Sequence, residues 1–254
     1  MAEDMKTIRQ KLQAATMEEL PVLFLQYEMD PRTGVHKEIE KARRRIAAYE
    51  KELARMEELK KYEREYSACA HICGIDEVGR GPLAGPVVAG AVILPKDCDI
   101  LYINDSKKLS EKKREELYEV ILEKAVAVGL GYSTPKRIDE INILQATYEA
   151  MREAVGQLSI VPDLLLNDAV TIPEVAIRQV PIIKGDAKSI SIGAASIVAK
   201  VTRDRLMVQY DEVYPAYGFA ANKGYGAQMH IEALKKYGPC PIHRKTFITH
   251  FCEV

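Results

Sequence analysis

Four acidic residues stand at or just past the ends of apolar, strand-like stretches: Asp76 with Glu77, then Asp168, then Asp186. Strand ends of an α/β sheet are where ligand sites collect. Carboxylates that converge there repel one another unless cations neutralise them, and a set made only of oxygen ligands favours Mg²⁺ or Mn²⁺. Two such ions about 4 Å apart can clamp the attacking and leaving oxygens of a phosphodiester.

A glycine loop, Gly79-Arg80-Gly81, directly follows the first acid pair. Glycines let backbone N–H groups approach a ligand closely, so acids and loop together predict a metal-dependent enzyme acting on a phosphate-bearing polymer. Gly79, Gly81 and Ala84 also fit the dinucleotide fingerprint, but the apolar run 87–94 predicts a strand where that fingerprint needs a helix. The dinucleotide interpretation therefore fails.

The adjacency of Asp76 and Glu77 sets a condition on the backbone. Neighbouring residues of a strand point to opposite faces of the sheet. The two carboxylates can share one site only if the chain turns at this point, which the glycines that follow would permit.

The elements that must position these residues begin after a composition boundary near residue 70. Residues 36–66 contain neither Gly nor Pro and carry a helical apolar stripe, and 3–28 read as shorter helices. Beyond the boundary, strands and helices are mixed, which predicts one α/β domain. We therefore expect a helical extension over residues 1–70 and a catalytic domain over residues 71–254.

The expected strands of that domain are 72–75, 86–94, 126–132, 162–167 and 175–183. The expected helices are 111–127, 139–158, 191–210 and 228–237, with Ser110 as the N-cap of the first.

Bulk properties narrow the class of protein. The chain has 254 residues, 47% hydrophobic and 29% charged, as in soluble globular proteins. It carries no signal peptide and no apolar run long enough to cross a membrane, so we expect a cytoplasmic protein. Its 5 cysteines are irregularly spaced and indicate reduced thiols rather than a zinc site. A net charge of −1 shows no basic excess for nucleic acid, although bound cations would change that balance.

A series of motifs over about residues 71–250 resembles bacterial-type ribonuclease HII, the type 2 ribonuclease H. They occur in order and at plausible spacing at residues 74–86, 104–110, 185–189, 194–204, 224–226 and 238–244. The resemblance implies a ribonuclease H-like fold, with a mixed central sheet flanked by helices. It also implies hydrolysis of RNA paired with DNA, with Mn²⁺ or Mg²⁺, and cleavage 5′ of single ribonucleotides in duplex DNA, which starts ribonucleotide removal.

Residue by residue, the resemblance makes the four acids the ligands of two metal ions, with Asp76 bridging both. Gly79, Arg80 and Gly81 match the loop that recognises the ribose 2′-hydroxyl through close backbone contacts. This hydroxyl is the group that distinguishes RNA from DNA. Tyr225 matches the tyrosine that stacks on the sugar of the next, DNA-type nucleotide. Further phosphate-contact candidates are Lys107, Lys108, Ser189, Lys200 and Arg203.

The chain departs from the family pattern at two sites. Ala169 follows Asp168 where related sequences usually have glycine, and Ala227 follows Gly226 where threonine is frequent. Arg80 favours type 2 over the type 3 enzyme, which cuts RNA stretches but leaves single ribonucleotides. That enzyme and a non-catalytic nucleic-acid binding module remain the alternatives. We expect a monomer, and the sequence leaves open the preferred metal, the protein partners and the role of residues 1–70.

Overall fold

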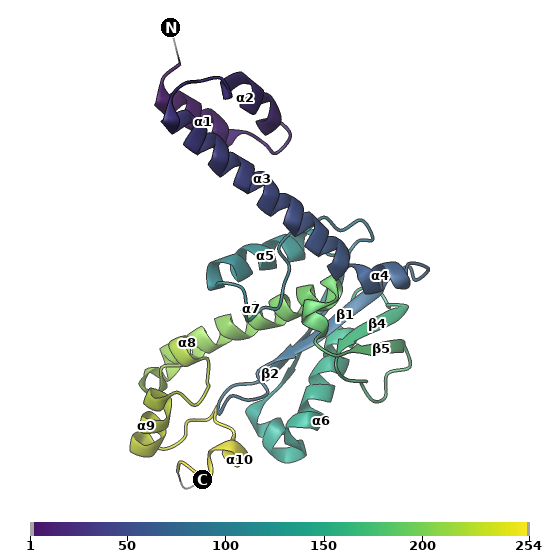
Figure 1. The fold of residues 1–254 in the computed structure, drawn as a ribbon. Coiled ribbons are helices and arrows are strands. Elements are labelled where there is room, and N and C mark those ends of the chain that lie inside the picture. Colours follow the sequence, from purple (N-terminus) through teal and green to yellow (C-terminus); the bar gives the residue numbers. More distant parts are fainter. Residues whose placement is uncertain (1–2, 253–254) are drawn as a thin grey trace. The chain divides into compact units, whose positions relative to one another are not determined.

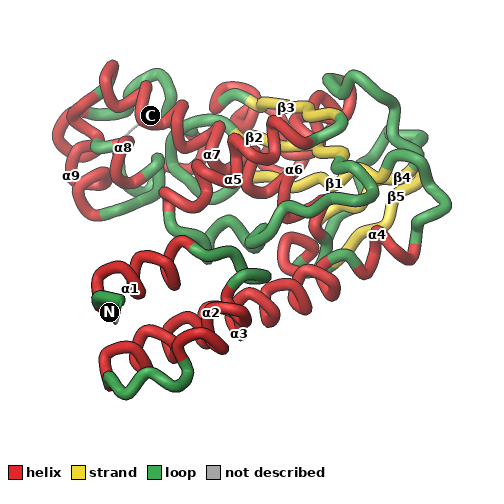
Figure 2. Tube along the Cα trace, turned by 90° about the horizontal axis from the view of Figure 1, so that it is seen from above, coloured by secondary structure: helices red, strands yellow, loops and turns green. Residues whose placement is uncertain are grey.

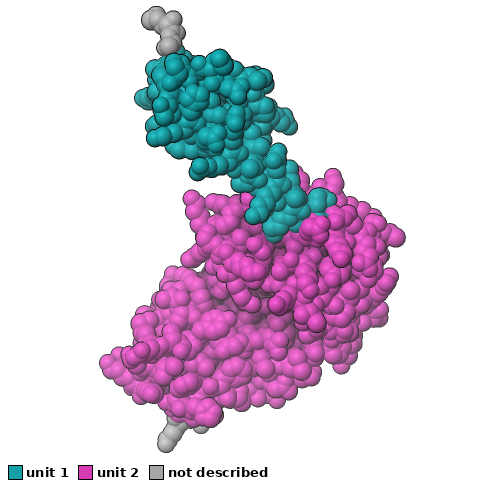
Figure 3. Space-filling model, in the orientation of Figure 1, with its two compact units in different colours: residues 1–57 teal, residues 58–254 magenta. Residues whose placement is uncertain are grey.

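The computed structural model describes residues 3–252 and divides into two compact units, residues 1–57 and 58–254 (Figure 3). The first unit holds α1 (Met5–Ala14), α2 (Leu20–Tyr27) and most of α3 (Thr33–Leu59). Asp4 caps α1 by accepting the backbone N–H groups of Lys6 and Thr7. The predicted apolar stripe of α3 is confirmed, because Ile39 and Ala42 are buried in the core of this unit.

The second unit is built on a five-stranded mixed sheet of order β3-β2-β1-β4-β5 (Figure 1). β1 (Ile72–Val78), β2 (Val87–Ile93) and β3 (Ala127–Ser133) are antiparallel neighbours. β4 (Leu164–Asp168) runs parallel to β1, and β5 (Arg178–Ile182) parallel to β4. The prediction of a mixed sheet flanked by helices, with a helical N-terminal segment, is confirmed.

Helices cover both faces of this sheet (Figures 1 and 2). α7 (Ile190–Val213) packs on β1 and β2 from one side and carries α5 (Glu111–Lys124) against it, and α6 (Pro135–Gly156) packs on β2 and β3 from the other side. A Cβ atom on Gly74 would lie 2.0 Å from the carbonyl carbon of Ser191. Glycine at this position therefore lets the start of α7 lie directly on β1.

Shorter elements complete the unit: α4 (Lys61–Glu65), η1 (Gly185–Ala187), η2 (Pro215–Tyr217), α8 (Phe219–Asn222), α9 (Gln228–Tyr237) and α10 (Lys245–Ile248). Tyr62 and Tyr66 pack against a buried cluster from β4, β5 and α7. This packing accounts for a division between the units that comes before the composition boundary near residue 70. No helix among residues 3–252 is long and apolar enough to cross a membrane.

The predicted strands and helices of the second unit are all present, although several of their boundaries differ. β1 does not end at Ile75, because it stays paired with β2 as far as Val78. β5 begins at Arg178, later than predicted. α6 begins at Pro135, where Thr134 caps the helix and proline takes the first helical position.

Candidate active site

The parallel pairing of β1 and β4 brings two of the four acids together. Ile75 is the register partner of Asn167, so the next residues, Asp76 and Asp168, lie side by side on neighbouring strands. Alternation along β1 puts Asp76 on the same face as Gly74, the face that α7 covers. Asp76 is only 7% exposed.

Glu77 follows Asp76 without the backbone turn that a shared site was expected to need, because β1 continues through both residues. Its side chain therefore leaves from the other face near the strand end. Burial nevertheless raises the pKa of both carboxylates, and the negative charge of Asp168 raises each further. Glu77 also pairs with Arg80, at 3.4 Å between Oε1 and Nη1.

Asp186 lies in η1, just after β5, and approaches Asp168 at the end of β4. The backbone N–H of Gly185 donates to Oδ1 of Asp168 over 2.7 Å, which ties the Asp186 turn to the end of β4. Burial raises the pKa of Asp186, and the charges of Asp105 and Asp168 raise it further. The charge of Asp168 thus acts on the other three predicted acids, and Asp105, which was not predicted as a site residue, acts on Asp186 as well.

The electrostatics of this cluster fit a hard divalent cation. Burial is the main cause that raises the pKa values of Asp76 and Glu77, and the negative charge of Glu77 also raises that of Asp76. Within residues 3–252, no three Asp, Glu, His or Cys side chains are arranged to hold a metal ion by themselves. The donor chemistry, oxygen-only and crowded with negative charge, nevertheless suits Mg²⁺ or Mn²⁺.

Two serine hydroxyl groups form a chain of hydrogen bonds that ends at Asp76. Ser196 of α7 donates a hydrogen bond that opposes the rise in the pKa of Asp76. Its Oγ lies 2.9 Å from Oγ of Ser106, and both serines are buried. Neither serine was predicted as a site residue, although both lie inside motifs that carry the resemblance. For Ser196, the available signal was a small polar residue in an otherwise buried helix start.

The glycine loop between β1 and β2 is held by Arg244, a fully buried residue. Its guanidinium donates to the backbone carbonyls of Gly79, Arg80 and Gly85, with 2.8 Å from Nη1 to the Arg80 oxygen. No role was predicted for this arginine, although it lies inside one of the motifs that carry the resemblance.

Two predicted phosphate contacts need correction. Arg203 is 0% exposed and donates to the carbonyl oxygens of Pro86, Ala84 and Lys223 at 2.9, 3.1 and 2.9 Å. Ser189 is 0% exposed and caps α7 through the N–H of Ile192. Since neither side chain has access to solvent, we withdraw both as phosphate contacts.

The other predicted substrate residues lie nearer the surface. Tyr225 is 44% exposed, and its Cε1 is 3.8 Å from where a Cβ on Gly81 would be, so its ring stands beside the glycine loop. Lys107 and Lys108 are exposed, and the charge of Lys107 acts on Asp186. Lys200 is ion-paired with Asp204, with 2.7 Å between Nζ and Oδ1.

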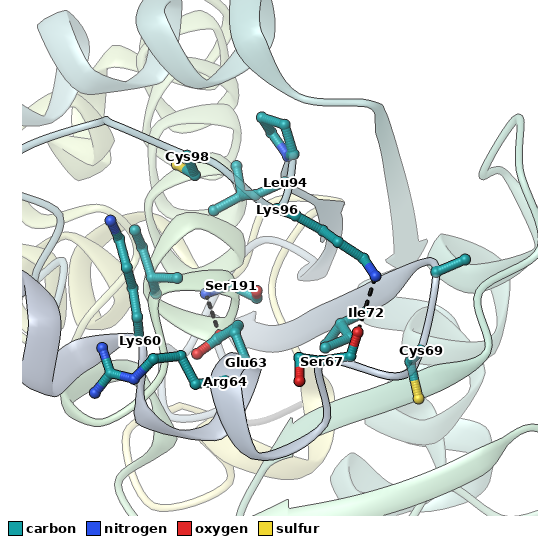
Figure 4. Close-up of a pocket in the computed structure, with 13 residues that line it drawn as sticks. Lys60, Glu63, Arg64, Ser67, Cys69, Ile72, Leu94, Lys96, Cys98 and Ser191 are labelled. Atoms are coloured by element: carbon teal, nitrogen blue, oxygen red, sulfur yellow. Dashed lines mark hydrogen bonds between the residues drawn. The ribbon is translucent and has the colours of Figure 1, made fainter.

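A separate cavity of about 140 Å³ lies behind the start of α7 (Figure 4). None of the four acids lines it. Glu63 of α4 is at its wall, where Oε1 accepts the Oγ–H of Ser189 at 2.6 Å and the N–H of Ser191 at 3.0 Å. Lys96 donates to the backbone oxygen of Ser67 nearby. The cavity is therefore separate from the carboxylate site, and Glu63 in its wall holds the start of α7.

Comparison with known proteins supplies two family matches. A model described as ribonuclease HII matches residues 73–253, and a model of the ribonuclease HII N-terminal domain matches residues 4–67. The helical N-terminal segment therefore resembles a domain recognised in its own right.

Individual relatives agree with these matches. A protein named ribonuclease HII from Lachnoclostridium phytofermentans is 68% identical over 222 residues, 87% of this chain and 87% of the relative. The crystal structure of ribonuclease H2 from Pyrococcus horikoshii is 31% identical with a TM-score of 0.59, covering 69% of this chain and 93% of that chain. Bst-RNase HIII in complex with Mn²⁺ is 17% identical with a TM-score of 0.53, covering 66% and 63%, and shows the shared fold alone.

Proposed function

The chain belongs to the ribonuclease HII family, metal-dependent endoribonucleases acting on RNA–DNA hybrids, and we propose that it also cuts 5′ of single ribonucleotides in duplex DNA. One observation carries the proposal: acidic residues of β1, β4 and η1 adjoin a glycine loop whose backbone is held by Arg244. The N–H of Gly185 links η1 to Asp168 of β4, and the guanidinium of Arg244 donates to the oxygen of Arg80 in the loop. A cut at such positions would begin the removal of ribonucleotides from DNA.

We propose that Asp76, Glu77, Asp168 and Asp186 hold two divalent ions, Mg²⁺ or Mn²⁺. When bound, such ions supply Lewis-acid stabilisation of the attacking and departing oxygens, which would leave 5′-phosphate and 3′-hydroxyl ends. Neutralisation by a cation would relieve the repulsion that raises the pKa values of Asp76 and Asp186. The hydrogen bond from Ser196 favours the charged form of Asp76, the form that binds a cation.

Substrate recognition is assigned to the loop and to Tyr225. Gly79 has a φ of 90° and Gly81 carries no side chain, so backbone groups of the loop can come close to a ribose 2′-hydroxyl. The half-exposed ring of Tyr225 beside Gly81 is suited to stack on the neighbouring deoxyribose. The exposed Lys107 and Lys108, with Lys200, are the retained candidates for phosphate contacts.

The test is cleavage of an end-labelled DNA duplex that contains one ribonucleotide, with Mg²⁺ and Mn²⁺ in turn and a chelator control. We expect a metal-dependent cut on the 5′ side of the ribonucleotide. Asp76→Asn and Asp186→Asn should abolish the cut while hybrid binding persists. Asp99→Asn, which removes an exposed acid paired with Lys124, is the matched control and should cleave like the wild type.

Each contrary result has a definite meaning. Full activity of either site variant would refute the carboxylate assignment. Degradation of a long hybrid without a cut at the single ribonucleotide would favour the type 3 specificity. Binding without cleavage of either substrate, in the presence of metal, would favour a non-catalytic module.

A further inference from the structure

Two buried histidines lie beneath the Tyr225 loop and belong to none of the groups described above. His230 of α9 is 0% exposed and His243 is 4% exposed. Their Nε2 atoms are 2.9 Å apart. The rings are enclosed by Tyr217 and Phe219, with 4.8 Å between the ring centroids of Tyr217 and His243 and 5.2 Å between those of Phe219 and His230.

The hydrogen-bond partners determine which nitrogen of each ring carries a proton. Nδ1 of His230 is 2.8 Å from the backbone oxygen of Tyr225, which only accepts, so this nitrogen must donate. In a neutral ring Nε2 of His230 then accepts, and Nε2 of His243 must donate to it. Nδ1 of His243 is left as an acceptor, and the backbone N–H of Cys240 donates to it at 2.9 Å.

Both rings are held neutral by their surroundings. Burial lowers the pKa of His230. Burial and then the neighbouring charge of His230 lower the pKa of His243 to about 4. One directed chain of hydrogen bonds therefore runs from Cys240 through His243 and His230 to Tyr225, and each ring uses one donor and one acceptor.

On its N-terminal side the Tyr225 loop is held to the glycine loop, because the oxygen of Gly224 accepts the N–H groups of Leu83 at 2.8 Å and Ala84 at 3.3 Å. Tyr225 itself has fewer restraints. Tyr225 lies between Gly224 and Gly226, neither of which has a side chain to pack. Its N–H donates to the oxygen of Asn222, and its carbonyl also accepts the N–H of Ala227 at 2.8 Å. Both of these contacts are local in sequence. The bond from His230 is different, because it ties the carbonyl of Tyr225 to a ring that is enclosed by Tyr217 and Phe219.

We propose that His230, oriented by His243, is a positioning residue that sets the place of the Tyr225 ring and thereby the preference for an RNA-to-DNA junction. The inference rests on the proposed function, in which Tyr225 reads the deoxyribose next to the cut. The histidines do not touch the substrate. They act through the backbone carbonyl of Tyr225.

A matched pair of substitutions at one position separates this role from packing. In His230→Asn the side-chain amide lies near the place of Nδ1 and can still donate to the Tyr225 carbonyl. In His230→Gln the amide lies near the place of Nε2, so the contact with His243 is kept and that with Tyr225 is lost. The readout is the ratio of kcat/KM on a single-ribonucleotide duplex to kcat/KM on a long RNA–DNA hybrid.

We expect the Gln variant to lower this ratio about tenfold, the factor that corresponds to one lost hydrogen bond, while kcat on the hybrid stays near that of the wild type. The Asn variant should keep the ratio within about threefold of the wild type. Equal ratios in the two variants would overturn the positioning role. A wild-type enzyme without junction cleavage would instead refute the proposed function, and this inference with it.

A second measurement needs no variant and so does not depend on whether the variants fold. Histidine tautomers in the full-length, ¹⁵N-labelled wild-type protein can be read from NMR spectra at neutral pH. The inference requires the proton on Nδ1 of His230 and on Nε2 of His243. A proton on Nε2 of His230 would remove the bond to Tyr225 and overturn the proposal.

Discussion

Ala169, next to the proposed metal ligand Asp168, has a backbone conformation that costs free energy. Its φ is 58°, in the left-handed region. The N–H of Val170 donates to the oxygen of Asp168 at 2.8 Å, and the N–H of Ala169 donates to Ile182 at 3.0 Å, so the turn is held on both sides. A side chain in this conformation costs about 1–2 kcal/mol relative to glycine.

Ala169→Gly should therefore stabilise the protein. Glycine gives up more freedom on folding, which offsets about 0.4–1 kcal/mol of the relieved strain. The net gain is about 0.5–1 kcal/mol, or roughly 2 °C in Tm for a domain of this size. Thermal unfolding followed by circular dichroism in chelator would measure the shift, and urea unfolding would give the free energy.

The control is Ala125→Gly, at the end of α5, where φ is −65°. No strain is relieved there, so this substitution should destabilise by about 0.4–1 kcal/mol. The reasoning predicts opposite signs for the two variants. A Tm for Ala169→Gly at or below that of the wild type would show that the left-handed conformation of Ala169 carries no recoverable strain.

Three further predictions concern residues of the site and its support. In chelator, the stability that protonated Asp76 contributes is fully present below the pKa of the unfolded carboxyl and is lost as pH rises through its raised pKa in the folded protein. Asp76→Asn should therefore raise Tm more at about pH 8 than at about pH 5, and equal shifts would count against the electrostatic account. Gly79→Ala puts a Cβ 2.2 Å from Nε of Arg203, so hybrid cleavage should fall by more than about tenfold, and wild-type kinetics would contradict the described loop. Glu63→Ala should cost about 1–3 kcal/mol in urea unfolding because Ser189 loses its acceptor, and Glu63→Gln should cost less because an acceptor oxygen remains; equal losses would remove the hydrogen bond as the cause.

The four acids proposed as metal ligands could be selected from the sequence because their signal is local. An acid at the end of an apolar strand is visible in the sequence, and a parallel pair such as β1 and β4 brings two such ends together, as with Asp76 and Asp168. Contacts between residues that lie far apart in the sequence could not be predicted in the same way. The approach of Asp105 to Asp186 depends on how a long connection folds back, which no periodicity encodes.

The prediction of phosphate contacts failed at Ser189 and Arg203 for a different reason. Ser189 is the N-cap of α7 and Arg203 lies within it, and the residues of this helix from Ile190 to Ala199 are all buried. A helix start covered on every side has no apolar stripe to separate inward from outward positions. Residue type then becomes the only guide, and serine and arginine are ordinarily surface residues. The capping role of Ser189 is a local signal that was not used, whereas the inward guanidinium of Arg203 follows from tertiary packing.

The placement of Arg203 and Arg244 shows why a substrate loop can require buried cations. The loop between β1 and β2 has carbonyl groups that no strand partner satisfies, and buried carbonyls need donors. A guanidinium presents five N–H donors in a fixed plane, more than any other side chain. Burial lowers the pKa of Arg203 to about 10 and that of Arg244 to about 9, and the charge of Arg203 contributes to the latter. Both groups therefore remain charged at neutral pH. They fix the loop through its own backbone and place positive charge behind the surface proposed to meet the phosphates, so two arginines that contact no phosphate can still favour its binding.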